Sequence, residues 1–228
     1  MFVNQLRKKN PALVNAVFDL HQTGQISPDS YIIDVDTFME NASYIAKTAE
    51  AYGIRLFFML KQVGRNPYLA KKLIDIGYEG AVTVDYKEAE VMMLHHIPIK
   101  NAGHLVQIPS RKVKEIVAYG AEYITVYTRE KIEEIQKAAE ELRKIQKILL
   151  RVSADGDMMY SGQTAGFSPE EMKETASWTK KNCTNVKIAG VTSFPCYLYD
   201  SEEKKVRPMH NLKTVLDAAE TLKKMGID

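Results

Sequence analysis

Residues 113–127 read Val113-Lys114-Glu115-Ile116-Val117-Ala118-Tyr119-Gly120-Ala121-Glu122-Tyr123-Ile124-Thr125-Val126-Tyr127. Val113, Ile116 and Val117 recur at helical spacing, and Gly120 follows them, where a helix can end in the left-handed conformation that glycine tolerates. The apolar run at 123–127 then predicts a buried strand. A helix that ends at a glycine just before an apolar strand is the repeating unit of parallel α/β proteins.

The same unit recurs along the chain. Gly53 and Gly77 end two further amphipathic helices, and an apolar strand follows each of them. The strands predicted in this way span residues 31–36, 54–60, 80–84, 105–108, 123–127, 148–152 and 188–192, and one of the helices between them spans 129–147. Roughly seven strands alternating with helices predict a (β/α)8 TIM-type barrel. A doubly wound sheet is the alternative, but no Gly-x-Gly-x-x-Gly follows any strand.

The two ends of the sequence suggest where the barrel domain lies. A helix is expected at 11–22, so residues 1–30 are interpreted as an N-terminal helical extension and 31–228 as the barrel domain. After a helical stripe at 212–225, Gly226 repeats the helix-ending signal, and Ile227 begins another apolar run. We therefore expect an incomplete barrel that is cut before its eighth strand.

Composition excludes several classes of protein. The 228 residues are 45% hydrophobic and 26% charged with a net charge of +2, which is typical of a soluble protein and gives no sign of nucleic-acid binding. No apolar stretch is long enough to cross a membrane. Cys183 and Cys196 form no metal or redox motif, which favours the cytoplasm and predicts no metal site.

Lys61 is the leading candidate for chemistry. It ends the apolar run at 56–60 and precedes a turn-like stretch at 62–67, so a strand would deliver its amine to the barrel mouth. Burial there would disfavour the ammonium form and leave an amine able to attack an aldehyde such as that of pyridoxal phosphate. A lysine at a strand end can instead be solvated or ion-paired.

Four segments in this order resemble the alanine-racemase-like family of fold-type III pyridoxal-phosphate enzymes. They are Ile33-Asp34-Val35-Asp36-Thr37, Phe58-Met59-Leu60-Lys61, Leu149-Leu150-Arg151-Val152-Ser153-Ala154-Asp155-Gly156 and Gly190-Val191-Thr192-Ser193-Phe194. The opening helix and the stretch after Lys61 look closest to an uncharacterised bacterial branch of amino-acid racemases. In that family the barrel precedes a separate C-terminal β domain, which is absent here.

The resemblance implies pyridoxal phosphate as the cofactor, an amino acid as the substrate and a homodimer for the full-length protein. Lys61 would form the Schiff base with the cofactor and act as the base on one face. The cofactor-binding residues would be Lys61, Asp34, Arg65, Arg151 and Ser193. Asp36 is expected to cap the next helix instead. Because the opposite base would lie in the missing domain, we expect the chain alone to be inactive.

Departures from the family pattern leave the reaction open. Arg65 stands where a phosphate-binding tyrosine is expected, Arg151 replaces a lysine and Ser193 replaces a histidine. The arginine expected after Gly156 is absent, and Met158 to Gly162 stand there. An aldolase, a decarboxylase, a non-catalytic pyridoxal-phosphate-binding protein and a sugar-phosphate barrel without this cofactor are the alternatives to a racemase.

Overall fold

The computed structural model describes residues 2–227 and divides into two compact units, Met1–Ile54 and Arg55–Asp228. The first unit contains α1 (Phe2–Lys9), α2 (Pro11–Gln22) and α3 (Val35–Ala51). The predicted helix at 11–22 is confirmed. Asn10 caps α2 by accepting a hydrogen bond from the Leu13 N–H at 3.0 Å, and it donates one to Asp34 at 2.9 Å.

The predicted strand at 31–36 is wrong, because this segment leads into a helix. The carboxylate of Asp34 accepts hydrogen bonds from the backbone N–H of Thr37 at 3.0 Å and from its hydroxyl at 2.8 Å. Asp34 is therefore the N-cap of α3, and Asp36 lies in the first helical turn rather than at the cap. Tyr31, which was expected to lie inside a sheet, is exposed.

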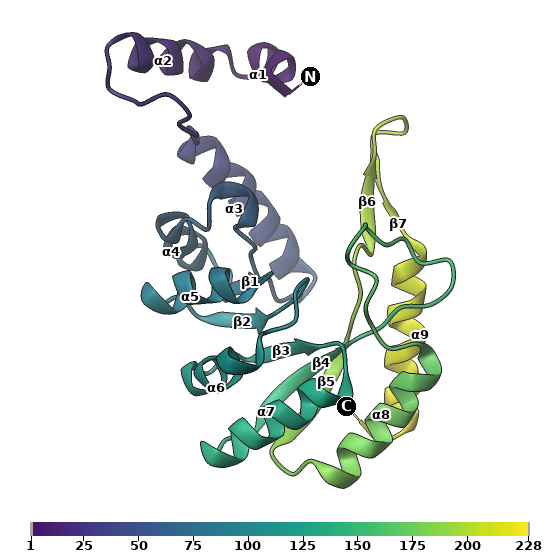
Figure 1. Cartoon of the computed structure of the whole chain (residues 1–228). Helices are drawn as coiled ribbons and strands as arrows, with labels where there is room; N and C mark the ends of the chain where they lie inside the picture. The colour runs from purple at the N-terminus through teal and green to yellow at the C-terminus, as the bar shows by residue number, and fades with distance from the viewer. Residues whose placement is uncertain (1, 228) are drawn as a thin grey trace. The chain divides into compact units, whose positions relative to one another are not determined.

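The second unit is an α/β domain built on a parallel sheet. Its strands are β1 (Ala81–Thr83), β2 (Ile99–Ala102), β3 (Tyr123–Val126), β4 (Gln146–Arg151) and β5 (Val186–Thr192). They pair in the order β1-β2-β3-β4-β5, and all of the pairings are parallel (Figure 1). The predicted incomplete TIM-type barrel is confirmed: within residues 2–227 the sheet does not close.

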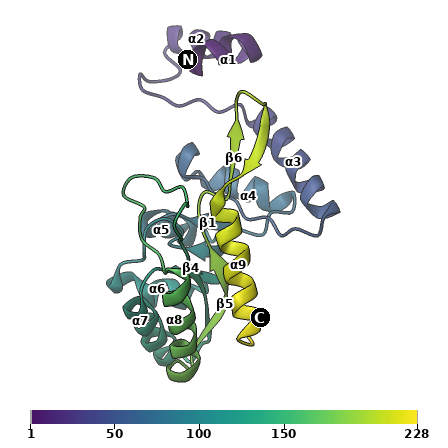
Figure 2. The same cartoon turned by 90° about the vertical axis from the view of Figure 1, so that its right-hand side faces the viewer.

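Helices connect the successive strands, as the sequence pattern predicts. They are α4 (Pro67–Asp75), α5 (Tyr86–Leu94), α6 (Ser110–Tyr119), α7 (Arg129–Glu141), α8 (Pro169–Asn182) and α9 (His210–Lys224). Figure 2 shows α9 alongside β5, which it contacts. The helix predicted at 129–147 ends early, at Glu141, because Arg143 adopts a left-handed φ of 52° ahead of β4.

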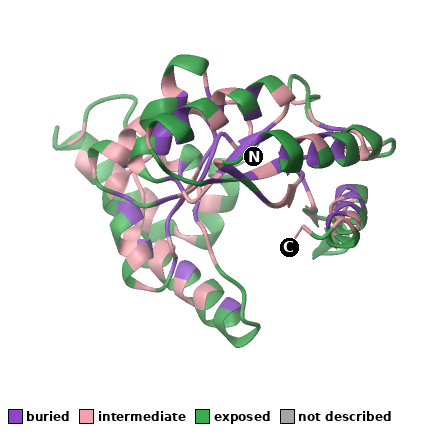
Figure 3. Ribbon diagram, turned by 90° about the horizontal axis from the view of Figure 1, so that it is seen from below, coloured by how far each residue is buried: buried purple, intermediate pink, exposed green. Residues whose placement is uncertain are grey.

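The core lies between the strands and the inner faces of these helices. Val113, Ile116 and Val117 are buried as their helical spacing predicts, and Ile124 and Ile148 are buried on the strands. Each such side chain contributes about 1.5–3 kcal/mol when it is fully buried. Exposed residues cover the outward helical faces in Figure 3.

Two strand predictions need correction in this unit. The strand placed at 105–108 is wrong: β2 covers Ile99–Ala102, and residues 104–106 form a loop whose N–H groups bond to carbonyls at the end of β1. The segment at 54–60 makes only one isolated bridge, Phe58 with Ala81, although Phe58 N–H also bonds to Gly80 O at 3.0 Å.

An antiparallel hairpin interrupts the last repeat, and the sequence pattern did not predict it. It consists of β6 (Tyr197–Asp200) and β7 (Lys205–Pro208), and it stands between β5 and α9 (Figure 1). Its strands are short and mostly exposed, so they lack the continuous apolar run by which the other strands were found.

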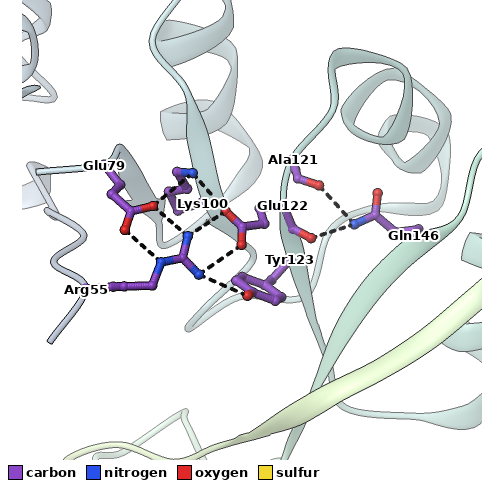
Figure 4. Close-up of polar contacts among 7 residues, drawn as sticks. All are labelled: Arg55, Glu79, Lys100, Ala121, Glu122, Tyr123 and Gln146. Carbon is purple, nitrogen blue, oxygen red and sulfur yellow. Dashed lines mark hydrogen bonds and ion pairs between the residues drawn. The ribbon is translucent and has the colours of Figure 1, made fainter. Parts of the chain in front are cut away.

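A charged network joins segments at the N-terminal ends of the strands. Arg55 bonds to both carboxylate oxygens of Glu79 at 2.7 and 2.6 Å and to both of Glu122 at 3.1 and 3.0 Å (Figure 4). Lys100 lies 3.2 Å from Glu79 and 2.8 Å from Glu122. These hydrogen bonds lower the pKa of Glu79 and of Glu122 to about 2. At this end of a barrel, such a network serves stability.

Candidate active site

Lys61 stands at the C-terminal end of the strand-like segment, at the start of a single 3-10 turn, Lys61–Val63. Leu60 before it is buried, whereas Lys61 itself is exposed. The expected burial of this amine is therefore wrong, and its side chain is accessible to a reagent. Its position at the barrel's C-terminal end agrees with where active sites of this fold lie.

The Phe194 ring is the centre of a cluster beside Lys61. Lys61 Nζ lies 5.9 Å from the ring centroid. The His104 ring meets the Phe194 ring edge-on at 5.9 Å between centroids, and the Tyr160 ring packs on it at 5.9 Å. An amine, an imidazole and a phenol from three separate loops thus surround one phenyl ring.

His104 is held in this cluster as a neutral imidazole. The Tyr127 hydroxyl donates a hydrogen bond to the His104 carbonyl at 2.5 Å, which fixes the loop after β2. Burial, followed by the positive charges of Arg151 and Lys61, lowers the pKa of His104 to about 4. Its Nδ1 atom is buried and has no partner within residues 2–227.

Arg151 ends β4 and is only 2% exposed. Its Nη2 donates a hydrogen bond to the Phe194 carbonyl at 3.1 Å, so Phe194 links Arg151 with Lys61. Burial lowers the pKa of Arg151, while the nearby Tyr127, Cys196 and Asp157 act in the opposite direction. Nε and Nη1 are buried, and neither has a partner among the described residues.

Arg65, the expected phosphate ligand, is partly engaged by a carboxylate. It adopts a left-handed φ of 55° after the Lys61 turn, and its Nη2 lies 3.1 Å from Asp85 Oδ2. Asp85 also caps α5 by accepting from the Glu88 N–H at 2.8 Å. The Arg65 Nε remains buried without a partner in the described part of the chain.

Glu88 fastens the Lys61 segment to β1. It is 1% exposed, and its carboxylate accepts hydrogen bonds from the Val84 N–H at 2.8 Å and from the Leu60 N–H. Burial raises the pKa of Glu88, and these two hydrogen bonds act against that shift. Together with the Asp85–Arg65 pair, it holds both ends of the turn that carries Lys61.

Ser193 is buried beside the cluster and is held by Asn211. The Asn211 amide donates to Ser193 Oγ at 3.2 Å and to the Met158 carbonyl at 3.0 Å, and it accepts from the Met158 N–H at 3.0 Å. Asp157 bonds to His210 and Thr214 of α9 at 2.8 Å each. The long loop after β4, which carries Tyr160, is thus tied to α9.

Asp34 belongs to the other compact unit, where it caps α3. Hydrogen bonds from Thr37 and Asn10 lower the pKa of this carboxyl. The structure therefore brings Lys61, Arg151 and Ser193 together around Phe194, and Arg65 lies at the end of the Lys61 turn.

Sequence reasoning missed His104, Tyr160, Phe194 and Asn211 as members of the cluster. Nothing in the neighbourhood of His104 along the chain points to Lys61. Within residues 2–227 no group of three or more His, Cys, Asp or Glu side chains could hold a metal ion. None of the described helices is long and apolar enough to span a membrane.

Comparison with known proteins decides the family. Residues 33–228 match the family described as alanine racemase, N-terminal domain. The chain belongs to this family. It is therefore a barrel of the alanine-racemase-like, fold-type III group.

Among curated relatives of this family member is the uncharacterized protein YhfX of Escherichia coli strain K12. The two are 45% identical over 227 residues, which is 100% of this chain and 58% of the relative. The chain thus spans little more than half the length of that protein.

Solved structures share the fold of this alanine racemase N-terminal domain at low identity. Diaminopimelate decarboxylase from Helicobacter pylori has a TM-score of 0.64 at 15% identity, covering 83% of this chain and 49% of that one. D-threonine aldolase from Filomicrobium marinum has a TM-score of 0.60 at 19% identity, covering 73% of this chain and 44% of that one. Alanine racemase from Clostridium difficile 630 has a TM-score of 0.62 at 14% identity, covering 84% of this chain and 50% of that one. These likenesses support the fold alone.

The cluster in this domain fits the cofactor of the family. Pyridoxal phosphate is an anionic aromatic aldehyde, and the barrel mouth offers an exposed amine, Lys61, beside an aromatic ring, Phe194. The buried cation Arg151 has donors still to be satisfied. An amine, a flat apolar surface and unpaired positive charge are the groups that such a molecule needs.

Proposed function

We propose that this chain is the cofactor-binding barrel of a pyridoxal-phosphate-dependent amino-acid racemase, an isomerase. The observation that carries the proposal is the position of Lys61, at the C-terminal end of a barrel strand, exposed and 5.9 Å from the Phe194 ring. The family match over residues 33–228 supports it.

In this proposal Lys61 Nζ binds the cofactor covalently. When bound, pyridoxal phosphate supplies a conjugated ring that stabilises negative charge at the substrate Cα. Lys61 Nζ would also take the proton from the substrate Cα on its own face. A racemase needs a second proton-transfer group on the other face, and we propose that this group lies outside residues 1–228, so that these residues alone racemise slowly or not at all.

The remaining proposed cofactor contacts are Arg65, Arg151, Ser193 and Asp34, of which Arg151 would lie near the cofactor ring rather than at its phosphate. Arg65 would bind the phosphate through its unpaired Nε, because a guanidinium forms charge-assisted hydrogen bonds with phosphate oxygens. Ser193, held by Asn211, would add a hydroxyl donor. For Asp34 the support is the family position alone.

The proposal extends to the full-length protein and its setting. We propose an amino acid as the substrate, a homodimer as the assembly and the cytoplasm as the location. The homodimer is proposed from the family alone.

Absorbance titration tests the function. Pyridoxal phosphate added to the chain should give a yellow band that borohydride abolishes, and Lys61→Ala should give none. Lys72→Ala is the matched control, because Lys72 Nζ also lies over an aromatic ring, 5.0 Å from the Tyr68 centroid. An equal band in the wild type and Lys61→Ala would refute the assignment. Absence of a band from both this chain and the full-length protein would refute the cofactor.

A further inference from the structure

Arg151 carries a buried charge that the described residues leave uncompensated. Its guanidinium makes one hydrogen bond, to a neutral carbonyl, and its Nε and Nη1 atoms have no partner within residues 2–227. A buried cation without an ionic partner destabilises a protein by several kcal/mol unless a counter-ion binds. A buried, unpaired guanidinium of this kind is therefore a candidate binding group for an anionic ligand.

The Asp157 carboxylate does not fill this role. It attracts Arg151 electrostatically, but within residues 2–227 no hydrogen bond or ion pair joins the two side chains. Its oxygens are already occupied by His210 and Thr214 at 2.8 Å and by the Ala154 N–H at 2.9 Å. Among the described residues Arg151 therefore has no carboxylate of its own.

The surroundings of Arg151 suit a small anion of single charge. Apart from Asp157, its electrostatic neighbours are Tyr127, Cys196 and His104, which are a phenol, a thiol and a neutral imidazole. One carboxylate would balance one guanidinium in this place, whereas a phosphate dianion would leave a net negative charge buried. Charge balance thus selects a carboxylate over the cofactor phosphate.

We propose that Arg151 binds the carboxylate of the amino-acid substrate. This inference rests on the proposed function, since Lys61 would hold the cofactor to which the substrate amine attaches. Phe194 connects the two positions, with its ring beside Lys61 and its carbonyl on Arg151.

This contact also selects the class of reaction. A guanidinium that stabilises the bound carboxylate opposes decarboxylation, because the negative charge leaves that position as carbon dioxide forms. Proton removal at Cα keeps the carboxylate and its contact intact: the C–H bond breaks, the proton passes to Lys61 Nζ, and the electron pair stays with the substrate and cofactor. Arg151 thus favours racemisation over decarboxylation.

Nuclear magnetic resonance on the chain without cofactor tests the anion site by itself. The Nε–H signals of the arginines are followed during titration with sodium propionate, with ethylammonium chloride and with inorganic phosphate. Arg151 is assigned from its loss in Arg151→Met, or in Arg151→Lys if the first variant does not fold. Arg129 is the internal control, because Thr175 and Glu174 already occupy it at 3.0 and 3.2 Å.

Propionate should shift the Arg151 Nε–H signal until it saturates, whereas ethylammonium should leave that signal unchanged. The Arg129 Nε–H signal should not shift with either compound. Either of two results would overturn the proposal. One is an Arg151 signal that does not respond to propionate. The other is a signal that saturates at a lower concentration of phosphate than of propionate, which would assign Arg151 to the cofactor phosphate.

A second arm uses the protein loaded with pyridoxal phosphate and compares alanine with ethylamine by absorbance. The wild type should bind alanine about tenfold or more tightly than ethylamine, and in Arg151→Met the ratio should fall to about one. A yellow band with no change in that ratio would refute the carboxylate site alone. A missing band would refute the proposed function, while the propionate titration would still decide the site.

Discussion

The carboxylate of Glu88 accepts a hydrogen bond from the Val84 N–H at 2.8 Å and another from Leu60, the residue before Lys61. One buried side chain therefore joins the end of β1 to the segment that presents the amine. In a capping box this glutamate would reach back to the cap residue itself, Asp85. Here it reaches further and fixes the neighbouring strand end.

Glu88→Ala should destabilise the fold and loosen the Lys61 turn. Leaving buried N–H groups unsatisfied costs about 1–3 kcal/mol each, so the free energy of unfolding should fall by about that amount or more in urea titrations. Glu88→Gln, which keeps one acceptor oxygen, should lose less. Glu90→Gln on the same helix, which changes a partly exposed ion pair with Lys112, should alter stability by under about 0.5 kcal/mol. Equal losses in Glu88→Ala and Glu90→Gln would contradict the role of Glu88.

The charged network around Arg55 should make stability fall in acid. The pKa values of Glu79 and Glu122 are lowered from 4.5 to about 2, so the folded state favours the charged carboxylates. Their contribution is fully present above pH 4.5 and is lost as the pH falls toward about 2.

Arg55→Met should therefore lower the melting temperature at pH 6 and lose most of that effect near pH 2. Lys114→Met, which removes an exposed pair with Glu141 at 2.8 Å, is the control and should have a small effect at both values. A loss in Arg55→Met that is the same at both pH values would show that packing, not charge, is responsible.

His104 should report on the charge of Lys61. Its pKa is lowered to about 4 by burial and by the charges of Arg151 and Lys61. Lys61→Met should therefore raise the pKa of His104, as measured from the pH dependence of its ring proton signal, and Lys72→Met should leave it unchanged. If Lys61→Met does not move this pKa, the two side chains do not share a site.

The lowered pKa of His104 should also make the stability of the fold depend on pH. Folding favours the neutral imidazole of His104, so its contribution is present above pH 6.5 and is lost as the pH falls toward about 4. His104→Phe, which cannot take up a proton, should unfold with a weaker dependence on pH between these values.

Asn211→Ala should release the loop after β4. Asn211 is fully buried, and its amide makes three hydrogen bonds, to both backbone groups of Met158 and to Ser193. We expect faster protease cleavage within residues 154–166 and a free energy of unfolding that is lower by about 1–3 kcal/mol. Asn182→Ala, which removes one exposed bond to the Trp178 carbonyl, is the control. Unchanged cleavage in Asn211→Ala would show that other contacts hold the loop.

The fold was largely predictable because most strands are apolar runs that follow an amphipathic helix. A helix-ending glycine, Gly77 or Gly120, precedes β1 and β3, whereas β4 and β5 could be found from their apolar runs alone. The strand predicted at 31–36 failed because Asp34 caps a helix, which is a local hydrogen bond that outweighs the strand propensity of the flanking residues. The strand predicted at 105–108 failed because a loop can also be apolar.

The site was less predictable than the fold. Lys61 could be found because it ends a strand-like run, but its exposure depends on which side chains cover it. The meeting of His104, Tyr160 and Phe194 depends on three loops that are far apart in sequence. The pairing of Arg65 with Asp85 likewise crosses 20 residues and has no local signal.

The most direct test of Lys61 as the cofactor lysine is peptide mapping after reduction. The chain is incubated with pyridoxal phosphate, reduced with borohydride and digested, and every lysine-containing peptide is measured by mass spectrometry. We predict one dominant pyridoxyl label, on the peptide that contains Lys61, with little label on Lys72 or Lys147. Labelling spread evenly over exposed lysines, or concentrated on another lysine, would contradict the proposed role of Lys61.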